Sequence, residues 1–276
     1  MGNSWTWARF DREVRRRESS LLKKLGEFPD AVLVAGCQRS GTTILTRVIR
    51  SRPGVVSFQI GKDDELDAAL ILSGRIRAPD HNGRFCFQTT YLNERYKEYL
   101  EHENYRLIWV VRNPYSAICS MLYNWRRSAL NRLFRGCGVE FLTEDQRRHY
   151  DTFGPYAISR ARKACLAYRS KAAQLVLLKQ QLPRDRLLVV DYDQLISNIP
   201  KVVGHVLDFL DIEPLSGSDY GIHANSARKA ERLSRRQRRL IKQLCQESYE
   251  KALSCVTPIS TPQCRHESAA SASATP

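Results

Sequence analysis

The segment Ala31–Leu45, with the sequence AVLVAGCQRSGTTIL, constrains the fold of this chain more than any other part of it. Its apolar start predicts a buried parallel strand. Two glycines, Gly36 and Gly41, then bracket a tight turn before a helical pattern opens at Thr42. Backbone amides at a helix N-terminus point toward an anion, and the helix dipole adds to the attraction. This strand–loop–helix layout therefore predicts an α/β fold with a phosphate-binding loop.

The spacing of this loop nearly matches the Walker-A pattern, with one change. Thr42 holds the position of the lysine that contacts the β- and γ-phosphates of ATP or GTP. The cation of the loop lies three residues earlier, at Arg39. We therefore expect the loop to bind a phosphate-like group differently from an ATPase. A strand-to-helix turn without any phosphate role stays the alternative.

The chain is strongly basic. Its 276 residues include 44 Lys and Arg against 29 Asp and Glu, a formal net charge of +15. Such a charge favours polyanions, acidic membrane surfaces or small anionic ligands, without choosing among them. The length fits one large α/β domain or two small ones. The apolar content of 42% predicts a globular fold.

Cysteine spacing and apolar runs bear on the compartment. The eight cysteines form no CxxC pair and no Cys/His zinc spacing, so we expect buried thiols in a reducing environment. The longest apolar runs, such as Leu107–Val111, are far shorter than the about 20 residues of a membrane-spanning helix. The N-terminus lacks the apolar core of a signal peptide. We expect a cytoplasmic protein; the start Met1–Thr6 fits a loose myristoylation pattern, which stays open.

Strand and helix patterns alternate along the chain. We expect strands at 31–35, 84–88, 105–111 and 187–190. We expect helices at 5–26, 42–51, 63–72, 114–125, 156–181, 199–210 and 226–252. Because the strands are continuous apolar runs between helices, we predict a three-layer α/β/α fold with a central parallel sheet, whose ligands bind beyond the carboxyl ends of the strands. Residues 126–154 are predicted to be an irregular, basic insertion that shapes a substrate entrance.

A second candidate anion site follows the strand at 105–111. Arg112 comes directly after this strand, and Pro114 falls in the first turn of the next helix, where its missing amide does no harm. Ser120 lies eight residues past Arg112, about two helical turns further on. A guanidinium and a hydroxyl at this separation could bind a phosphate. A capping arginine and a helix-surface serine are the alternative.

Together, these two segments resemble the cofactor motifs of PAPS-dependent sulfotransferases, where PAPS is 3′-phosphoadenosine 5′-phosphosulfate. In that family a loop similar to Gln38–Thr43 (QRSGTT) holds the 5′-phosphosulfate. A strand–turn–helix similar to Val111–Ser120 holds the 3′-phosphate, with the same spacing of eight between arginine and serine. The stretch Val189–Leu195 (VVDYDQL) resembles a further family segment. The resemblance covers about residues 31–212.

The resemblance implies a sulfotransferase that moves the sulfuryl group of PAPS to a hydroxyl or amine, with no metal required. The acceptor would be a small molecule or a carbohydrate, an acidic one being an option, and not a nucleic acid. Arg39 would stabilise the charge of the leaving oxygen. The residues that would bind the cofactor are Arg39, Ser40, Gly41, Thr42, Thr43, Arg112, Ser120, Tyr192 and, on a late loop, Asn225, Ser226, Arg228 and Lys229. The domains would be an N-terminal helical segment at 1–28, the sulfotransferase domain at 29–256 and a disordered tail at 257–276.

The base that deprotonates the acceptor is not given by the motifs. The stretch that resembles the family's KTH segment is Gln88–Thr90 (QTT), which has no histidine. Another branch uses a glutamate about twenty residues past the loop arginine, which here falls on Gln59. The candidates are Glu65 and Asp64, followed by His81; solvated acids at a helix N-terminus are the alternative for the carboxylates.

Two other functions stay open. The strand at 187–191 ends in an acid, as a Walker-B segment does, and favours a nucleotide-dependent phosphotransferase, although the loop lysine is missing. The basic run at 228–239 favours a nucleic-acid-binding protein, but it lacks interleaved aromatic residues for base stacking.

Overall fold

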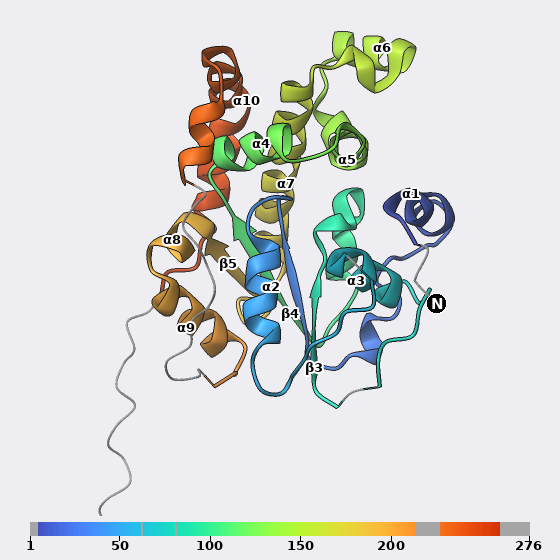
Figure 1. Ribbon diagram of the computed structural model, residues 1–276, viewed down its shortest axis with the longest axis vertical. Coiled ribbons are helices and arrows are strands. Elements are labelled where there is room, and N and C mark those ends of the chain that lie inside the picture. The colour runs from blue at the N-terminus through green and yellow to red at the C-terminus, as the bar shows by residue number, and fades with distance from the viewer. Residues whose placement is uncertain (1–4, 62, 81, 214–226, 260–276) are drawn as a thin grey trace, which may run out of the picture.

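The computed structural model describes residues 5–61, 63–80, 82–213 and 227–259, and its centre is one parallel sheet (Figure 1). The sheet has five strands in the order β2-β3-β1-β4-β5, and all its pairings are parallel. The strands are β1 (Ala31–Gly36), β2 (Val55–Val56), β3 (Arg84–Gln88), β4 (Tyr105–Val111) and β5 (Leu187–Asp191). The four predicted strands are thus confirmed, and β2 is an addition too short to show a pattern.

Helices surround this sheet. The α-helices are α1 (Trp7–Phe10), α2 (Thr42–Arg50), α3 (Asp64–Leu72), α4 (Pro114–Tyr123), α5 (Arg127–Leu133), α6 (Glu144–Phe153), α7 (Arg160–Gln181), α8 (Tyr192–Ser197), α9 (Ile199–Phe209) and α10 (Arg235–Leu253). Short 3₁₀ or π segments cover Asp11–Arg15, Leu25–Glu27, Thr90–Leu100, Phe134–Gly138, Val139–Phe141, Gly154–Ala157 and Ala227–Arg232.

The central strand β1 separates two hydrophobic cores, because successive side chains of a strand point to opposite faces. Val32 and Val34 belong to a cluster with α2, α8 and α9. Leu33 and Ala35 belong to another with α3, α7 and the N-terminal segment. Figure 1 shows α2 and α7 on opposite sides of the sheet. The predicted three-layer α/β/α fold is therefore confirmed.

The N-terminal segment differs from the single helix predicted at 5–26. Residues 7–15 are helical, and the chain then continues in turns to the short 3₁₀ segment Leu25–Glu27. The carboxylate of Glu98 accepts hydrogen bonds from the amides of Leu21 and Leu22, which a helix would have used internally. The apolar spacing has another cause: these leucines fill the same core as the sheet.

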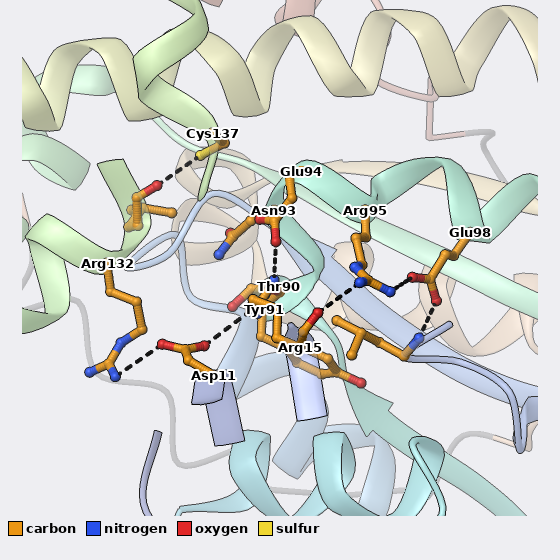
Figure 2. Close-up of polar contacts among 12 residues, drawn as sticks. Asp11, Arg15, Thr90, Tyr91, Asn93, Glu94, Arg95, Glu98, Arg132 and Cys137 are labelled. Carbon is orange, nitrogen blue, oxygen red and sulfur yellow. Dashed lines mark hydrogen bonds and ion pairs between the residues drawn. The ribbon is translucent and has the colours of Figure 1, made fainter. Parts of the chain in front are cut away.

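A network of charged groups fixes this segment to the body of the protein (Figure 2). Arg15 donates to Asp11 at 3.0 Å and to Glu94 at 2.8 Å, and Asp11 also accepts from Arg132 of α5 at 3.3 Å. The segment 5–28 is thereby attached both to the Thr90–Leu100 segment and to the helices above the carboxyl edge of the sheet.

Residues 126–154, predicted to be irregular, are mostly helical. Helix α6 begins with a capping box between Thr143 and Gln146 and ends at Gly154, whose φ is +65°. Phe134 packs against Leu166 of α7. Capping residues and tertiary packing stabilise helices here that the weak apolar periodicity did not reveal.

The basic helix at the C-terminal end starts later than predicted. Ser234 caps α10 in a second capping box, with Gln237, so the α-helix begins at Arg235, and a 3₁₀ segment precedes it. The tail 260–276, the Met1–Ser4 stretch of the myristoylation pattern, and the predicted site residues His81, Asn225 and Ser226 lie outside the described residues.

The cysteines within the described ranges are free thiols, and all of them except Cys255 are buried. In the same ranges, every helix is too short or too polar to cross a lipid bilayer.

Candidate functional site

A cleft of about 610 Å³ opens at the carboxyl edge of the sheet. Its walls come from the turn after β1 and the start of α2, the start of α3, the end of β3, the turn after β4 with the following helix, and the start of α8. Trp7 of α1 and Trp125 also line the cleft. The cleft lies where a parallel sheet is expected to bind its ligand.

Glycine geometry shapes the loop after β1. Gly36 has a φ of +144°, and a Cβ there would lie 2.5 Å from the carbonyl oxygen of Val110 on β4. Gly41 has a φ of +92°, and a Cβ there would lie 2.1 Å from the ring of Tyr192. Arg39 also adopts a positive φ, +71°. The loop is therefore in close contact with β4 and α8. It leads to the N-terminus of α2, whose first amides are free to bind an anion.

The two predicted anion segments meet in this cleft. Arg39 Nε donates to Ser120 Oγ at 3.0 Å, and Arg112 Nη1 donates to the Arg39 carbonyl at 2.6 Å. The Arg112 guanidinium lies over the Tyr192 ring, 4.4 Å from its centroid. Tyr168 of α7 donates to the Arg112 carbonyl at 2.6 Å and fixes the backbone there. The structure thus brings together Arg39, Arg112, Ser120 and Tyr192.

Unsatisfied donors of Arg112, which lines the cleft, and of Ser40, in the loop beside it, fit an anionic ligand. Ser40 Oγ and Arg112 Nε are buried without a hydrogen-bond partner among the described residues. Burial also lowers the pKa of both Arg39 and Arg112. An unmade hydrogen bond and a desolvated cation both cost free energy, which an anion held here would recover.

The hydroxyls that begin α2 take different positions. Thr42 is buried, and its Oγ1 accepts from Gln88 Nε2 at 3.3 Å. Thr43 is half-buried and lines the cleft. Both predicted residues lie at the helix N-terminus, with Thr42 also linking α2 to the end of β3.

Glu65 of α3 also lines the cleft. Thr90 Oγ1 donates to Glu65 Oε1, and Gln88 Nε2 lies 3.4 Å from Glu65 Oε2. Burial raises the pKa of Glu65 to about 7, and the neighbouring carboxylate of Asp63 adds to the increase. A carboxyl group that titrates near neutrality and faces a cleft has the properties of a general base.

The other two acids at this helix start are engaged elsewhere. Asp63 accepts from the amides of Glu65 and Leu66 as the N-cap of α3, and from the Trp7 indole at 2.8 Å. Asp64 lies 3.8 Å from Arg50 Nη1 and 3.9 Å from Arg47 Nε. Both line the cleft, but Asp63 is used as a helix cap and Asp64 lies near two arginines, whereas Glu65 has neither engagement.

The comparisons with known proteins agree with this geometry. A family model described as a sulfotransferase domain matches residues 29–248, more than half of the chain. The chain belongs to the sulfotransferase family. It has the fold of other sulfotransferases: the crystal structure from Alicyclobacillus acidocaldarius aligns over 82% of this chain and 95% of that one, with a TM-score of 0.53 and 12% identity. The sulfotransferase domain from the curacin biosynthetic pathway aligns over 82% and 97%, with a TM-score of 0.50 and 15% identity. A search of curated proteins finds no significant sequence match.

Family membership decides between the enzyme classes left open by the sequence. This protein is a sulfotransferase and not a phosphotransferase. The acid at the end of β5, Asp191, which suggested a Walker-B segment, has a different role: its Oδ1 accepts from the amide of Asp193 at 2.9 Å and caps α8.

Some residues of the sulfotransferase site were not predicted, or lie outside the description. Arg228 and Lys229 fall in the Ala227–Arg232 segment, but their side chains are not among those described. Gln38, although part of the quoted motif, was not assigned a role; its Nε2 donates to the Thr90 carbonyl at 2.9 Å. Trp7 and Trp125 line the cleft from distant parts of the chain, and no motif marks them.

Within the ranges that the structure describes, no group of three His, Cys, Asp or Glu side chains is placed to hold a metal ion.

Proposed function

We propose that this sulfotransferase moves the sulfuryl group of PAPS to a hydroxyl or amine of a small acceptor and releases 3′-phosphoadenosine 5′-phosphate (PAP). The observation that carries the proposal is the meeting of Arg39, Arg112 and Ser120 in one cleft beside the free amides of α2. Two anion-binding groups at neighbouring strand ends suit a cofactor with two anionic ends.

The residues divide between these two ends. Arg39, Ser40, Gly41, Thr42 and Thr43 would hold the 5′-phosphosulfate. Arg112 and Ser120 would hold the 3′-phosphate, with Tyr192 beside them and the predicted late-loop residues Ser226, Arg228 and Lys229 closing the site. PAPS supplies an activated sulfuryl group whose transfer leaves negative charge on the bridging oxygen.

Arg39 and the amides of α2 would stabilise this charge. A preorganised donor of this kind is worth about 3–4 kcal/mol of the barrier, by analogy with oxyanion-hole donors. The positive φ of Arg39 supports the assignment, because a strained residue at such a turn is a frequent mark of function.

Glu65 would accept the proton of the acceptor. Its pKa of about 7 means that a substantial fraction carries the charge at neutral pH, while the carboxylate remains basic enough to take a proton. Thr90 and Gln88 orient it, so the QTT stretch that lacks the family histidine supports the base instead of supplying it.

The acceptor would bind against the apolar part of the cleft lining. Trp7, Trp125, Ala129 and Ile44 make this lining partly apolar, which suits the ring of a small molecule or a sugar. We include acceptors that carry an acidic group in this proposal. The free thiols of the described cysteines support a reducing compartment such as the cytoplasm, which fractionation of cells expressing a tagged chain would test.

Nucleotide binding is the first test. We expect PAP to raise the melting temperature with or without magnesium, and ATP or GTP to have little effect under either condition. Arg112→Ala should remove most of the increase, because a lost charge-assisted contact costs about 1.5–3 kcal/mol; the exposed Arg126→Ala is the control. Equal stabilisation by ATP with magnesium, or an unchanged response of Arg112→Ala, would contradict the proposal.

A further inference from the structure

A lysine in the protein interior contacts the same residue, Thr90, as the candidate base Glu65. Lys171 of α7 is 2% exposed. Its Nζ donates to the Thr90 carbonyl at 2.9 Å, and among the described residues no carboxylate oxygen lies within 4.0 Å of it. Burial lowers its pKa, so the fold keeps an ammonium here at a cost in free energy. A buried cation without a direct ion pair calls for an explanation beyond packing.

The carbonyl that Lys171 binds belongs to the residue that holds Glu65. Thr90 donates through its hydroxyl to Glu65, while its carbonyl accepts from both Lys171 Nζ and Gln38 Nε2, each at 2.9 Å. Thr90 also begins the 3₁₀ segment after β3. Two donors from different elements therefore fix the peptide from which the Glu65 contact is made.

Four titratable groups act on the charge of Lys171. They are Cys37, Cys137, Glu65 and Glu94. Burial raises the pKa of both thiols, which keeps them neutral. Glu94 is paired with Arg15 at 2.8 Å. Glu65 is therefore the neighbouring acid without its own cation.

The surroundings of Glu65 act in opposite directions. Burial and Asp63 favour its protonated form, whereas the Thr90 hydrogen bond and the positive charges of Lys171 and Arg15 favour the carboxylate. Of the two cations, Arg15 is shared among Asp11, Glu94 and the Tyr91 carbonyl. Lys171 donates to the Thr90 carbonyl, and the hydroxyl of the same residue donates to Glu65, so the ammonium lies close to the Thr90–Glu65 contact.

We infer that Lys171 is a positioning residue of the sulfuryl-transfer reaction: it fixes Thr90 against Glu65, and its charge keeps Glu65 in the proton-accepting state. The inference rests on the proposed role of Glu65 as base. In this role the Lys171 ammonium supports proton transfer and takes no part in binding the 5′-phosphosulfate or the 3′-phosphate.

The test follows the titration of Glu65 directly, so that no acceptor has to be known. The enzyme is labelled with ¹³C at the glutamate side-chain carboxyl carbon, saturated with PAP, and titrated by NMR, and the Glu65 signal is identified by its absence in Glu65→Gln. We expect Lys171→Met to move the midpoint upward by about 0.5–1 pH unit, because an opposite charge close by is lost. Lys171→Arg should stay near the wild-type midpoint.

Lys163→Met is the matched control. Lys163 is the other buried lysine of α7, and its Nζ donates to Asn131 Oδ1 at 2.7 Å, away from Thr90. It should leave the Glu65 midpoint unchanged. Where Lys171→Met does not fold, Lys171→Gln retains a polar group against the carbonyl without the charge and should give the same shift.

The outcomes separate this inference from the proposed function. An unchanged midpoint in both folded neutral variants, or a shift of the same size in Lys163→Met, would overturn the role of Lys171. Sulfuryl transfer that survives in Glu65→Gln would instead refute Glu65 as base, whatever the titration of Lys171→Met gives.

Discussion

The donor side and the base side of the cleft are built in different ways. On the donor side, Arg112 directly follows β4 and Arg39 lies three residues past the end of β1, and the backbone of these two adjacent strands brings them together. On the proposed base side, Glu65 accepts from Thr90 after β3, and the Thr90 carbonyl accepts from Lys171 in α7, so only the complete fold brings these elements together. Local backbone geometry defines the first half and tertiary packing defines the second. Mutations should therefore affect donor binding on one side and proton transfer on the other.

The largest effect is expected at the loop arginine. Arg39→Ala should lower kcat by about 10²–10³-fold, because it removes a preorganised cation from the site of developing charge. Steady-state kinetics with PAPS would measure it. Arg47→Ala, whose side chain is 72% exposed at the rim of the same cleft, is the control and should have a much smaller effect. A loss in kcat below tenfold for Arg39→Ala would contradict the proposal that Arg39 stabilises the charge on the leaving oxygen.

Glu65→Gln tests the base side. We expect a fall in kcat of about 10²-fold, as for the loss of general base catalysis. Since the carboxylate is the active form, the wild-type rate should rise with pH and level off above the pKa of about 7, and the residual activity of the variant should lack this rise. If the rate of Glu65→Gln still rises with pH, the pH dependence belongs to another group.

The same pKa has a consequence for stability. The folded pKa of Glu65 is raised above its ordinary value of 4.5, so the folded state holds this proton more tightly than the unfolded chain does. The free energy of unfolding should therefore decrease as the pH rises from about 4.5 to 7. Glu65→Gln should lose less stability over this window than the wild type, which thermal melts at pH 5 and pH 8 would show. An equal loss in both proteins would contradict the assignment.

Gly41→Ala addresses the donor side through the backbone. A Cβ would meet the Tyr192 ring at 2.1 Å on a backbone with positive φ, so the loop or the ring has to move. We expect PAP affinity to fall about tenfold, the equivalent of about 1.4 kcal/mol. Gly54→Ala is the control, because Gly54 also has a positive φ, +76°, but has nothing within 4 Å of the added carbon. It should cost some stability and leave PAP affinity unchanged.

The smallest effect is expected for Asp64→Asn. Its carboxylate lies against Arg47 and Arg50, so the variant should lose less than threefold in kcat. The same assay as for Glu65→Gln measures it. A loss as large as that of Glu65→Gln would mean that the base has been assigned to the wrong neighbour.

Much of the donor side could be predicted from the sequence, because its geometry is local. An apolar strand, a glycine turn and a helix start are consecutive in the chain, and the eight-residue spacing from Arg112 to Ser120 is set by one helix. The base side could not be predicted in the same way. Glu65 was one of three candidates, and what distinguishes it, the contact with Thr90, joins residues 25 apart.

The misassigned elements have similar reasons. The leucines after Arg17 repeat at helical spacing, yet the Glu98 carboxylate, far along the chain, takes the amides that a helix would need. In the basic stretch 126–154, the capping box of Thr143 and the packing of Phe134 stabilise helices whose sequence has little apolar periodicity. Periodicity detects a buried face, but it does not report which distant group competes for the backbone.

Trp7 lies in a part of the chain that precedes the matched family region, which starts at residue 29. The surface that it contributes to the cleft therefore lies outside the residues that the family model matches. Exchanging this N-terminal segment, while keeping its leucines in the core, should change which acceptors the enzyme uses and leave the residues proposed to bind PAPS unchanged.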